Sequence, residues 1–171
     1  NSYIVREKVL TGYVQANIDS GPVRGNVGVQ VVHTNQKGHG YTAGLNDDGD
    51  TVSGTISDGD KYTEVLPSLN LSFEAAPDTF IRFAAARMMA RARMDQMNPG
   101  VSYSFNEANN VNGADINLSP WSGTIGNAKL RPLMAETVDI AFEKYFGRGA
   151  YVSLGGFYMY LEIYIYRLDT I

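Results

Sequence analysis

The sequence contains no cysteine and only two histidines, His33 and His39, among its 171 residues. Without cysteine there can be no disulfide framework and no thiolate metal site. The two histidines are too few and too irregularly placed for a histidine metal site, and no nucleophile–base–acid arrangement can be recognised. We therefore predict that the protein is not an enzyme and has no cofactor.

An excess of basic charge is also missing. Lys and Arg number 14 against 18 Asp and Glu, which gives a net charge of −4. Proteins that bind nucleic acid normally carry a basic stripe, so nucleic acid is not expected as a partner. No apolar run approaches the roughly 18 residues that a membrane-spanning helix needs. Hydrophobic residues nevertheless make up 44% of the chain, so its composition is not that of a disordered protein.

Most of the chain alternates apolar with polar residues, as residues 10–18, 27–31, 64–74 and 137–143 illustrate. This period of two is typical of β-strands with one apolar and one polar face. The alternation predicts one face with Val14, Val29, Leu69, Leu71, Val138, Ile140, Val152 and Leu154. It places Gln15, Gln30, Asn70 and Asp139 on the other face.

Residues 80–97 are ambiguous, because they are rich in Ala, Met and Arg, which are good helix formers. They follow a short turn at residues 75–78 directly after an alternating segment, and this context favours a strand. We therefore predict an all-β fold of about six antiparallel strands in up-and-down order. The expected strands are residues 4–19, 25–36, 60–75, 79–97, 127–146 and 149–168.

The predicted connections alternate in length. Residues 19–25, 75–78 and 147–149 are short turns, whereas residues 35–61 and 98–125 are expected to be long polar loops. Short turns at one end and long loops at the other are typical of an outer-membrane β-barrel. A soluble sandwich would have shorter strands, with turns every roughly 8 to 12 residues. The chain is therefore predicted to form part of a transmembrane barrel wall.

Aromatic residues gather beside the short turns. Phe73 and Phe80 flank the second turn, and Phe146 and Tyr151 flank the third. Membrane barrels place aromatic girdles at both water–lipid interfaces, one of them next to the short turns. The alternative is that these aromatics fill a soluble core. We disfavour it because the polar face of every predicted strand is continuous.

Several segments resemble the barrel of TonB-dependent outer-membrane receptors. They are REKVLTGYVQANID at 6–19, VRGNVGVQVVHT at 23–34, YTEVLPSLNLSFEAAPDTFIRFAAAR at 62–87 and GNAKLRPLMAETVDIAFEKYFGRGAYVSLGGFY at 126–158. The last is similar to the family's "GNP-L-P … E-YF … FYK" pattern. Two positions depart from it: Ala128 stands where proline is common, and Met159-Tyr160 where Lys-Asp is usual.

The resemblance implies a barrel of the plugged, 22-stranded class in the outer membrane of a Gram-negative bacterium. It implies TonB-energised uptake of a scarce ligand, with outer-membrane lipid, a plug domain and the rest of the barrel as partners and TonB acting through the plug. Residues 1–171 are expected to be a partial barrel domain, an internal fragment without plug or C-terminal barrel end. Siderophore, cobalamin and saccharide remain open as ligand classes. The alternative is a stand-alone β-sheet binding module, or a small outer-membrane barrel without transport activity.

Four residues are candidate contacts to a ligand or a plug: Arg82, Arg87, Arg91 and Trp121. Arginines that point into the lumen could bind an anionic ligand or a plug carboxylate. Pairing with wall carboxylates is the favoured alternative, the candidates being Glu64, Glu74, Asp139 and Glu143. Trp121 could stack on a sugar or an aromatic ligand, although packing within its loop is favoured.

The loop at residues 46–60 repeats Asp-Gly-Asp at 48–50 and 58–60. Ca²⁺ takes six to eight oxygen ligands, so the carboxylates between Asp47 and Asp60 could coordinate it. The spacing does not match an EF-hand, because no glutamate closes the loop. A solvated extracellular loop is the favoured interpretation.

Overall fold

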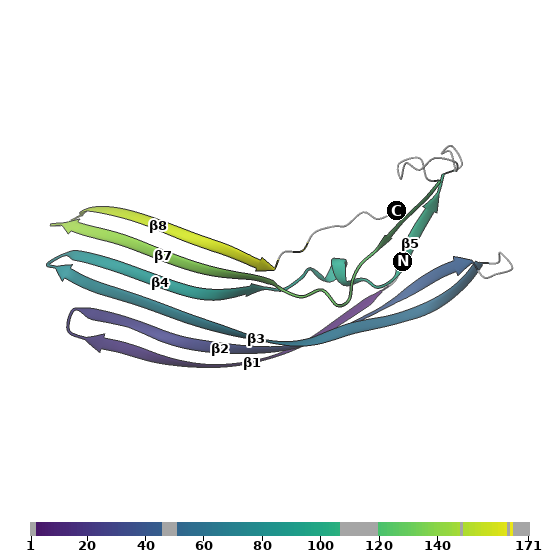
Figure 1. The fold of residues 1–171 in the computed structure, drawn as a ribbon, viewed down its shortest axis with the longest axis horizontal. Helices are drawn as coiled ribbons and strands as arrows, with labels where there is room; N and C mark the ends of the chain where they lie inside the picture. Colours follow the sequence, from purple (N-terminus) through teal and green to yellow (C-terminus); the bar gives the residue numbers. More distant parts are fainter. Residues whose placement is uncertain (1–2, 46–50, 107–119, 148, 164, 166–171) are drawn as a thin grey trace.

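The computed structural model describes residues 3–45, 51–106, 120–147, 149–163 and 165. Six long antiparallel strands form one curved sheet in the order β1-β2-β3-β4-β7-β8 (Figure 1). A second sheet, β5-β6, and a single 3₁₀ turn, η1, belong to the connection between β4 and β7. The elements are β1 (Ile4–Ser20), β2 (Val23–Leu45), β3 (Thr51–Ala76), β4 (Thr79–Ala90), η1 (Met94–Met97), β5 (Val101–Phe105), β6 (Trp121–Ile125), β7 (Leu133–Phe146) and β8 (Ala150–Ile163).

The three short turns lie together at one end of the sheet (Figure 1). Each contains a residue with positive φ: Gly21 at 60°, Asp78 at 59° and Gly147 at 58°. Glycine adopts this conformation without steric cost, and Asp is one of the few other residues that tolerate it. The amide of Glu74 donates to the Pro22 carbonyl at 2.8 Å, which joins the first turn to the second hairpin. The chain therefore reverses tightly at this end.

The strand register confirms the predicted division of residues between the two faces. Antiparallel partners point to the same side of a sheet. Leu71, Phe83 and Ile140 are successive partners across β3, β4 and β7, and so are Asn70, Ala84 and Asp139. We call the first set the apolar face and the second the polar face. On the apolar face lie Val14, Val29, Leu69, Val138, Val152 and Leu154, and on the polar face Gln15 and Gln30.

The prediction of a long polar loop at residues 35–61 is wrong. Strands β2 and β3 continue far beyond the predicted ends, and their pairing runs without a break from Val23↔Phe73 to Leu45↔Thr51. The expected loop at 98–125 is also partly strand, because β5 and β6 pair from Val101↔Ile125 to Phe105↔Trp121. Polar side chains can occupy both faces of a strand that stands in water, so these extensions lack the apolar alternation that identifies a half-buried strand.

Strand β4 ends at Ala90 instead of continuing to residue 97, as predicted. The chain there leaves the sheet, forms η1 and buries Met97, which is 2% exposed. Strand β7 begins at Leu133 instead of residue 127. Buried Pro132 precedes it and has no N–H to donate to a neighbouring strand. Strand β8 matches the prediction from Ala150 to Ile163, and most of the remaining predicted residues lie outside the described part.

The main sheet is open, with β1 and β8 as its two edges and no pairing between them in the described residues. A small closed barrel would require that pairing, so this part of the alternative interpretation is not what the structure shows. The connection from β4 to β7 covers part of the polar face instead. The most buried residues gather in this region: Val32, Thr34, Gln36, Tyr62, Met97, Ala128, Pro132 and Met134.

Candidate functional site

The long connection between β4 and β7 forms a second layer on the polar face. Along β2, Val32, Thr34, Gln36, Gly38 and Gly40 are buried, while Val31, His33 and Lys37 are exposed. This alternation shows that one face of the β2 extension is covered and the other is not. We call residues 91–100 and 126–132, which provide this cover, the crossover segment.

Glycines allow the backbone of the crossover segment to approach β2 closely. A Cβ added at Gly38 would lie 2.9 Å from the Met97 carbonyl oxygen and 3.1 Å from the Ala128 Cβ. A Cβ added at Gly40 would lie 2.7 Å from the Gly100 nitrogen. A side chain at either position would force the crossover backbone to move away from β2, so glycine allows the closest packing.

Polar contacts fix the second half of the crossover segment to β2 and β3. The Gln36 side-chain amide donates to the carbonyls of Ala128 and Leu130, at 2.9 and 2.8 Å. These two carbonyls are not part of a sheet, so the Gln36 amide supplies the hydrogen bonds that a neighbouring strand would otherwise donate. Because Gln36 is 2% exposed, losing these bonds would leave a buried amide without partners.

Two ion pairs join the same segment to β3. Lys129 Nζ lies 3.1 Å from Asp58 Oδ1, and Arg131 Nε lies 3.0 Å from Asp60 Oδ2. The Arg131 guanidinium also stands 5.4 Å from the centre of the Tyr62 ring, a cation–π distance. Asp58 and Asp60 are two residues apart on one strand and therefore point to the same face.

The pKa of the Asp58 carboxyl lies below its ordinary value of 3.8. The main cause is the hydrogen bond with Lys129, and the second is the Gly59 amide, which donates to Asp58 Oδ1 at 2.9 Å. Both stabilise the ionised carboxylate. The carboxyl group therefore stays charged over the neutral pH range.

Each of the three candidate arginines has a carboxylate partner. Arg82 Nε lies 3.1 Å from Glu143, as the favoured alternative expected. Arg87 instead pairs with Glu162 at 2.7 Å and Arg91 with Glu7 at 2.7 Å, neither of which was among the carboxylates named for this role. These partners lie 75 and 84 residues away in sequence. Their pairing depends on strand order, which sequence spacing does not reveal.

Trp121 begins β6, and its backbone pairs with Phe105. Its side chain lies outside the described part of the structure, so its stacking role stays a prediction.

The Asp-rich segment that is the calcium candidate is only partly described, because residues 46–50 lie outside the described part of the structure. In the described part of that loop, Asp58 and Asp60 pair with cations of the crossover segment. The described residues contain no group of three or more side chains arranged to hold a metal ion.

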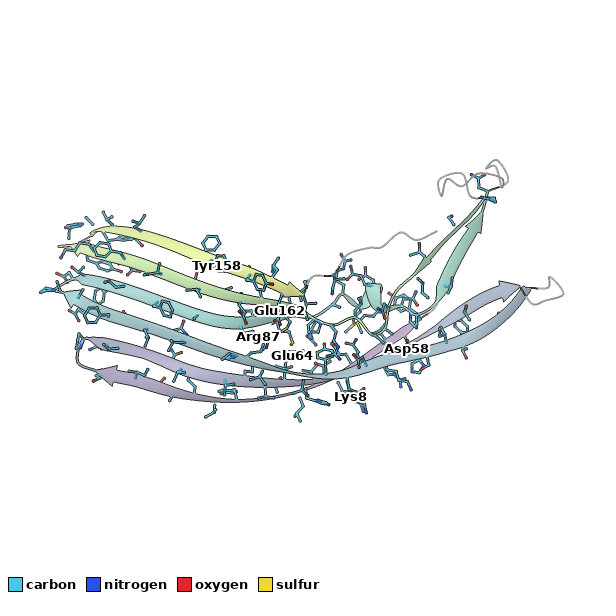
Figure 2. All side chains as sticks on the ribbon, in the orientation of Figure 1. Lys8, Asp58, Glu64, Arg87, Tyr158 and Glu162 are labelled. Carbon is cyan, nitrogen blue, oxygen red and sulfur yellow. The ribbon has the colours of Figure 1, made fainter. Side chains whose placement is uncertain are left out.

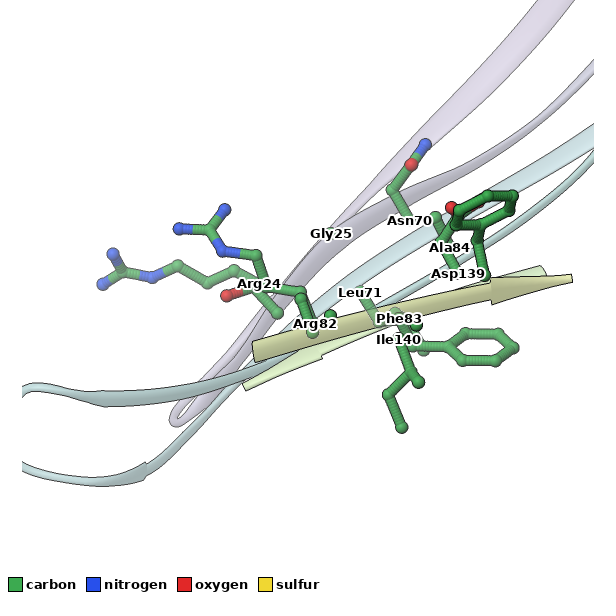
Figure 3. Close-up of a pocket in the computed structure, with 14 residues that line it drawn as sticks. Arg24, Gly25, Asn70, Leu71, Arg82, Phe83, Ala84, Asp139 and Ile140 are labelled. Carbon is green, nitrogen blue, oxygen red and sulfur yellow. The ribbon is translucent and has the colours of Figure 1, made fainter. Parts of the chain in front are cut away.

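A groove of about 520 Å³ lies toward the short turns. On the polar face, Ser72, Ala84 and Ala141 contribute small side chains to its lining, and Gly155 contributes backbone. Figure 3 shows Arg24 and Arg82 toward one end, where they stand on either side of Ser72 in one cross-strand row, while Ile140 points away on the apolar side. Arg24 is held only loosely, 3.7 Å from Asp19. Because Arg82 is already paired with Glu143, the Arg24 guanidinium is the more available of the two for a carboxylate or phosphate group of a molecule on the polar face.

The family comparison was made on the whole chain. The model of the TonB dependent receptor-like β-barrel family matches residues 1–171. The chain belongs to this family. No curated protein and no solved structure gave a significant match. As a receptor-barrel chain, the protein belongs to a transporter and receptor family and not to an enzyme family, and its sheet is part of a barrel wall.

Membership assigns the two faces of this barrel wall. In a transmembrane barrel the apolar side chains contact lipid and the polar ones face the interior. The crossover segment therefore lies on the interior side. No helix among the described residues is long and apolar enough to cross a membrane.

Sequence reasoning missed the contacts made by Gln36, Lys129 and Arg131. One signal was available: Gly38 and Gly40 continue the period of two beyond Gln36, the predicted end of one strand, and Asp58 continues it beyond Asp60, the predicted start of the next. Two glycines in phase with a buried amide indicate close approach of another backbone. The partner segment, about 90 residues away, could not be inferred in this way.

Proposed function

We propose that this chain supplies wall and long-loop segments of an outer-membrane receptor for the TonB-dependent uptake of a scarce ligand. The family match supports the receptor barrel. The carrying observation is the crossover segment, which is bound to the interior face by Gln36 and two ion pairs. A connection fixed in this way narrows the long-loop end of the barrel and gives an incoming ligand a defined surface.

The proposed partners follow from this position. The plug domain would occupy the interior next to the groove at the short-turn end, where the loosely held Arg24 offers a guanidinium group to its carboxylates. TonB would act through the plug, and outer-membrane lipid of a Gram-negative bacterium would surround the apolar face. Six strands would supply about a quarter of a 22-stranded wall. The ligand would be a siderophore, a cobalamin or a saccharide.

Uptake in whole cells tests the proposal. Cells that express the receptor containing this chain would be supplied with labelled siderophore, cobalamin or oligosaccharide, each with and without functional TonB. We expect one ligand class to accumulate only when both the receptor and TonB are present. Accumulation that is independent of TonB, or recovery of the receptor in the soluble fraction, would contradict the proposal.

The site itself is tested by Asp58→Asn with Asp60→Asn, which removes both ion pairs of the crossover segment. We expect weaker ligand binding with unchanged membrane insertion, because the altered residues lie beyond the apolar part of β3. Asp19→Asn is the matched control, since it removes an exposed carboxylate at the opposite end of the sheet. Equal ligand affinity of wild type, the double variant and the control would show that the crossover segment is not part of the ligand-binding site.

A further inference from the structure

Four cations occupy adjacent positions on the outward side of β1, β2 and β3. Lys8, Asn35 and Lys61 are direct cross-strand partners, and in the next row Arg6 is the partner of Lys37. Strand partners and residues two apart on one strand share a face. Arg6, Lys8, Lys37 and Lys61 are all exposed. We call them the basic patch.

The acids at the same height all lie on the opposite face. Glu7, the partner of Gln36, and Asp60 occupy one interior row, with Asp58 and Glu64 above and below it on β3. Figure 2 shows Lys8 on the other side of the ribbon from Asp58 and Glu64. Charge is thus sorted by face, although the whole chain is acidic.

Three of the four interior acids have cationic partners, whereas the basic patch lacks anionic ones. Glu7 pairs with Arg91, Asp58 with Lys129 and Asp60 with Arg131. Across the described residues, no carboxylate forms an ion pair with a cation of the basic patch. Like charges at neighbouring cross-strand positions repel each other. An external anion would remove this repulsion.

The position of the patch identifies the anion. The rows nearer the short turns are Leu10–His33–Thr63, then Gly12–Val31–Val65, then Val14–Val29–Pro67. The apolar, lipid-facing surface therefore ends at the Gly12–Val31–Val65 row. One mixed row, Leu10–His33–Thr63, separates it from Lys8 and Lys61. A cation at this border lies at the level of the lipid headgroups, on the long-loop side of the membrane.

The far side of the sheet has charges at its own apolar border, but they are balanced there. Arg87 lies opposite Glu136 and is 2.7 Å from Glu162 on β8. One cation next to two carboxylates offers no net attraction for an anion. Among the described residues at this long-loop border, the surplus of positive charge therefore lies on β1–β3.

We propose that the basic patch binds the phosphate groups of lipids in the surrounding leaflet. Ammonium and guanidinium groups on three adjacent strands can contact more than one phosphate at a time, so a lipid with two phosphates is a suitable probe. The apolar rows below the patch contact the acyl chains of the same lipid. This inference rests on the lipid-facing assignment of the apolar face and does not depend on which ligand is transported.

The test compares two lipids that differ only in phosphate. A diphosphorylated glycolipid and its dephosphorylated form are titrated separately into the complete, detergent-solubilised receptor that contains this chain, and bound lipid is counted by native mass spectrometry. Wild type is compared with a neutral variant, Arg6→Gln with Lys8→Gln, Lys37→Gln and Lys61→Gln. The charge-retaining control is Arg6→Lys with Lys8→Arg, Lys37→Arg and Lys61→Arg. Insertion into phosphatidylcholine vesicles, followed by protease protection, checks that all three proteins fold.

We expect the neutral variant to bind the phosphorylated lipid at least about tenfold more weakly, because each cation near an anionic surface contributes to binding. The charge-retaining variant should match wild type, and the dephosphorylated lipid should bind weakly to all three. Equal binding of the two lipids by wild type, or equal binding by wild type and neutral variant, overturns the proposal. Complete displacement by an equal concentration of inorganic phosphate would also overturn it, since the site would then select free phosphate. Failure of wild type to insert into vesicles would instead refute the membrane assignment of the sheet.

Discussion

Ile140 and Asp139 are consecutive residues of β7 on opposite faces of the sheet, opposite Phe83 and Ala84 respectively. We expect Ile140→Arg to cost about 2–4 kcal/mol if the residue lies near the bilayer midplane, because the guanidinium would enter the hydrocarbon region. Asp139→Arg should cost much less, since it faces the interior. Urea unfolding of the receptor in lipid vesicles measures both. Equal costs would show that the faces are assigned incorrectly.

Asp58 lies beyond the apolar part of β3 and has a lowered pKa. A carboxyl group whose pKa is lower in the folded protein stabilises it above the unfolded value of 3.8, and this contribution is lost as pH falls through the folded pKa. The effect should be small, because the group is exposed.

The expected result is a slightly lower unfolding midpoint for Asp58→Asn than for wild type at about pH 6, where the carboxylate is fully ionised. The difference should disappear well below pH 3.8. Lys129→Gln removes the same ion pair and should show the same pH dependence. A difference between wild type and Asp58→Asn that persists in acid would mean that ionisation of Asp58 is not its source.

At the scale of elements, the packing of the crossover segment against β2 can be tested by an engineered disulfide. The chain has no cysteine of its own, so any disulfide reports only the introduced pair. A Cβ at position 38 would lie 3.1 Å from that of Ala128 and 2.9 Å from the Met97 carbonyl oxygen, so the crossover backbone must move slightly away from β2. The same movement brings the two Cβ atoms to the roughly 3.5–4.5 Å of a disulfide. We therefore expect Gly38→Cys with Ala128→Cys to oxidise spontaneously in the periplasm.

The control pair is Gly12→Cys with Ala128→Cys. A Cβ at Gly12 has no neighbouring atom within 4 Å, and Gly12 lies on the apolar face. Electrophoresis with and without reductant measures both pairs. If the 38–128 pair stays reduced, or the 12–128 pair oxidises equally well, the crossover segment does not rest on the interior face of β2.

At the scale of the whole molecule, the sheet has two unpaired edges. In the described residues β1 pairs only with β2, and β8 pairs only with β7. Unpaired N–H and C=O groups along a long strand favour edge-to-edge association. Large apolar-face side chains on β8 add to this tendency, since Leu154 is 73% and Tyr158 66% exposed. Contiguous exposed apolar side chains favour association in water.

We therefore expect the 171-residue chain, expressed alone, to aggregate or to require detergent. Size-exclusion chromatography with light scattering in detergent-free buffer is the measurement. Restoring the neighbouring strands, by expressing the complete receptor, should remove the association. A stable monomer that unfolds cooperatively without detergent would favour a stand-alone soluble β-protein instead.

The sequence by itself determined the six main strands, the short turns and the faces of the barrel wall. These follow from local physics: alternation sets the two faces, and glycine or aspartate supplies the positive φ of the turns. The segment resemblance gave the family, which the match over residues 1–171 confirms. The predicted strand ends failed where β2 and β3 leave the lipid and both faces become polar.

Only the tertiary structure decided which distant groups meet. Arg91 pairs with Glu7 and Arg131 with Asp60 because the crossover segment returns across the polar face after β4. Alternation could not predict this contact, since a polar face looks the same whether water or another backbone covers it. The sorting of Lys8 and Lys61 outward and Asp58 and Asp60 inward likewise depends on the register of three strands. A shift of one residue in that register would exchange the two charges between lipid and interior.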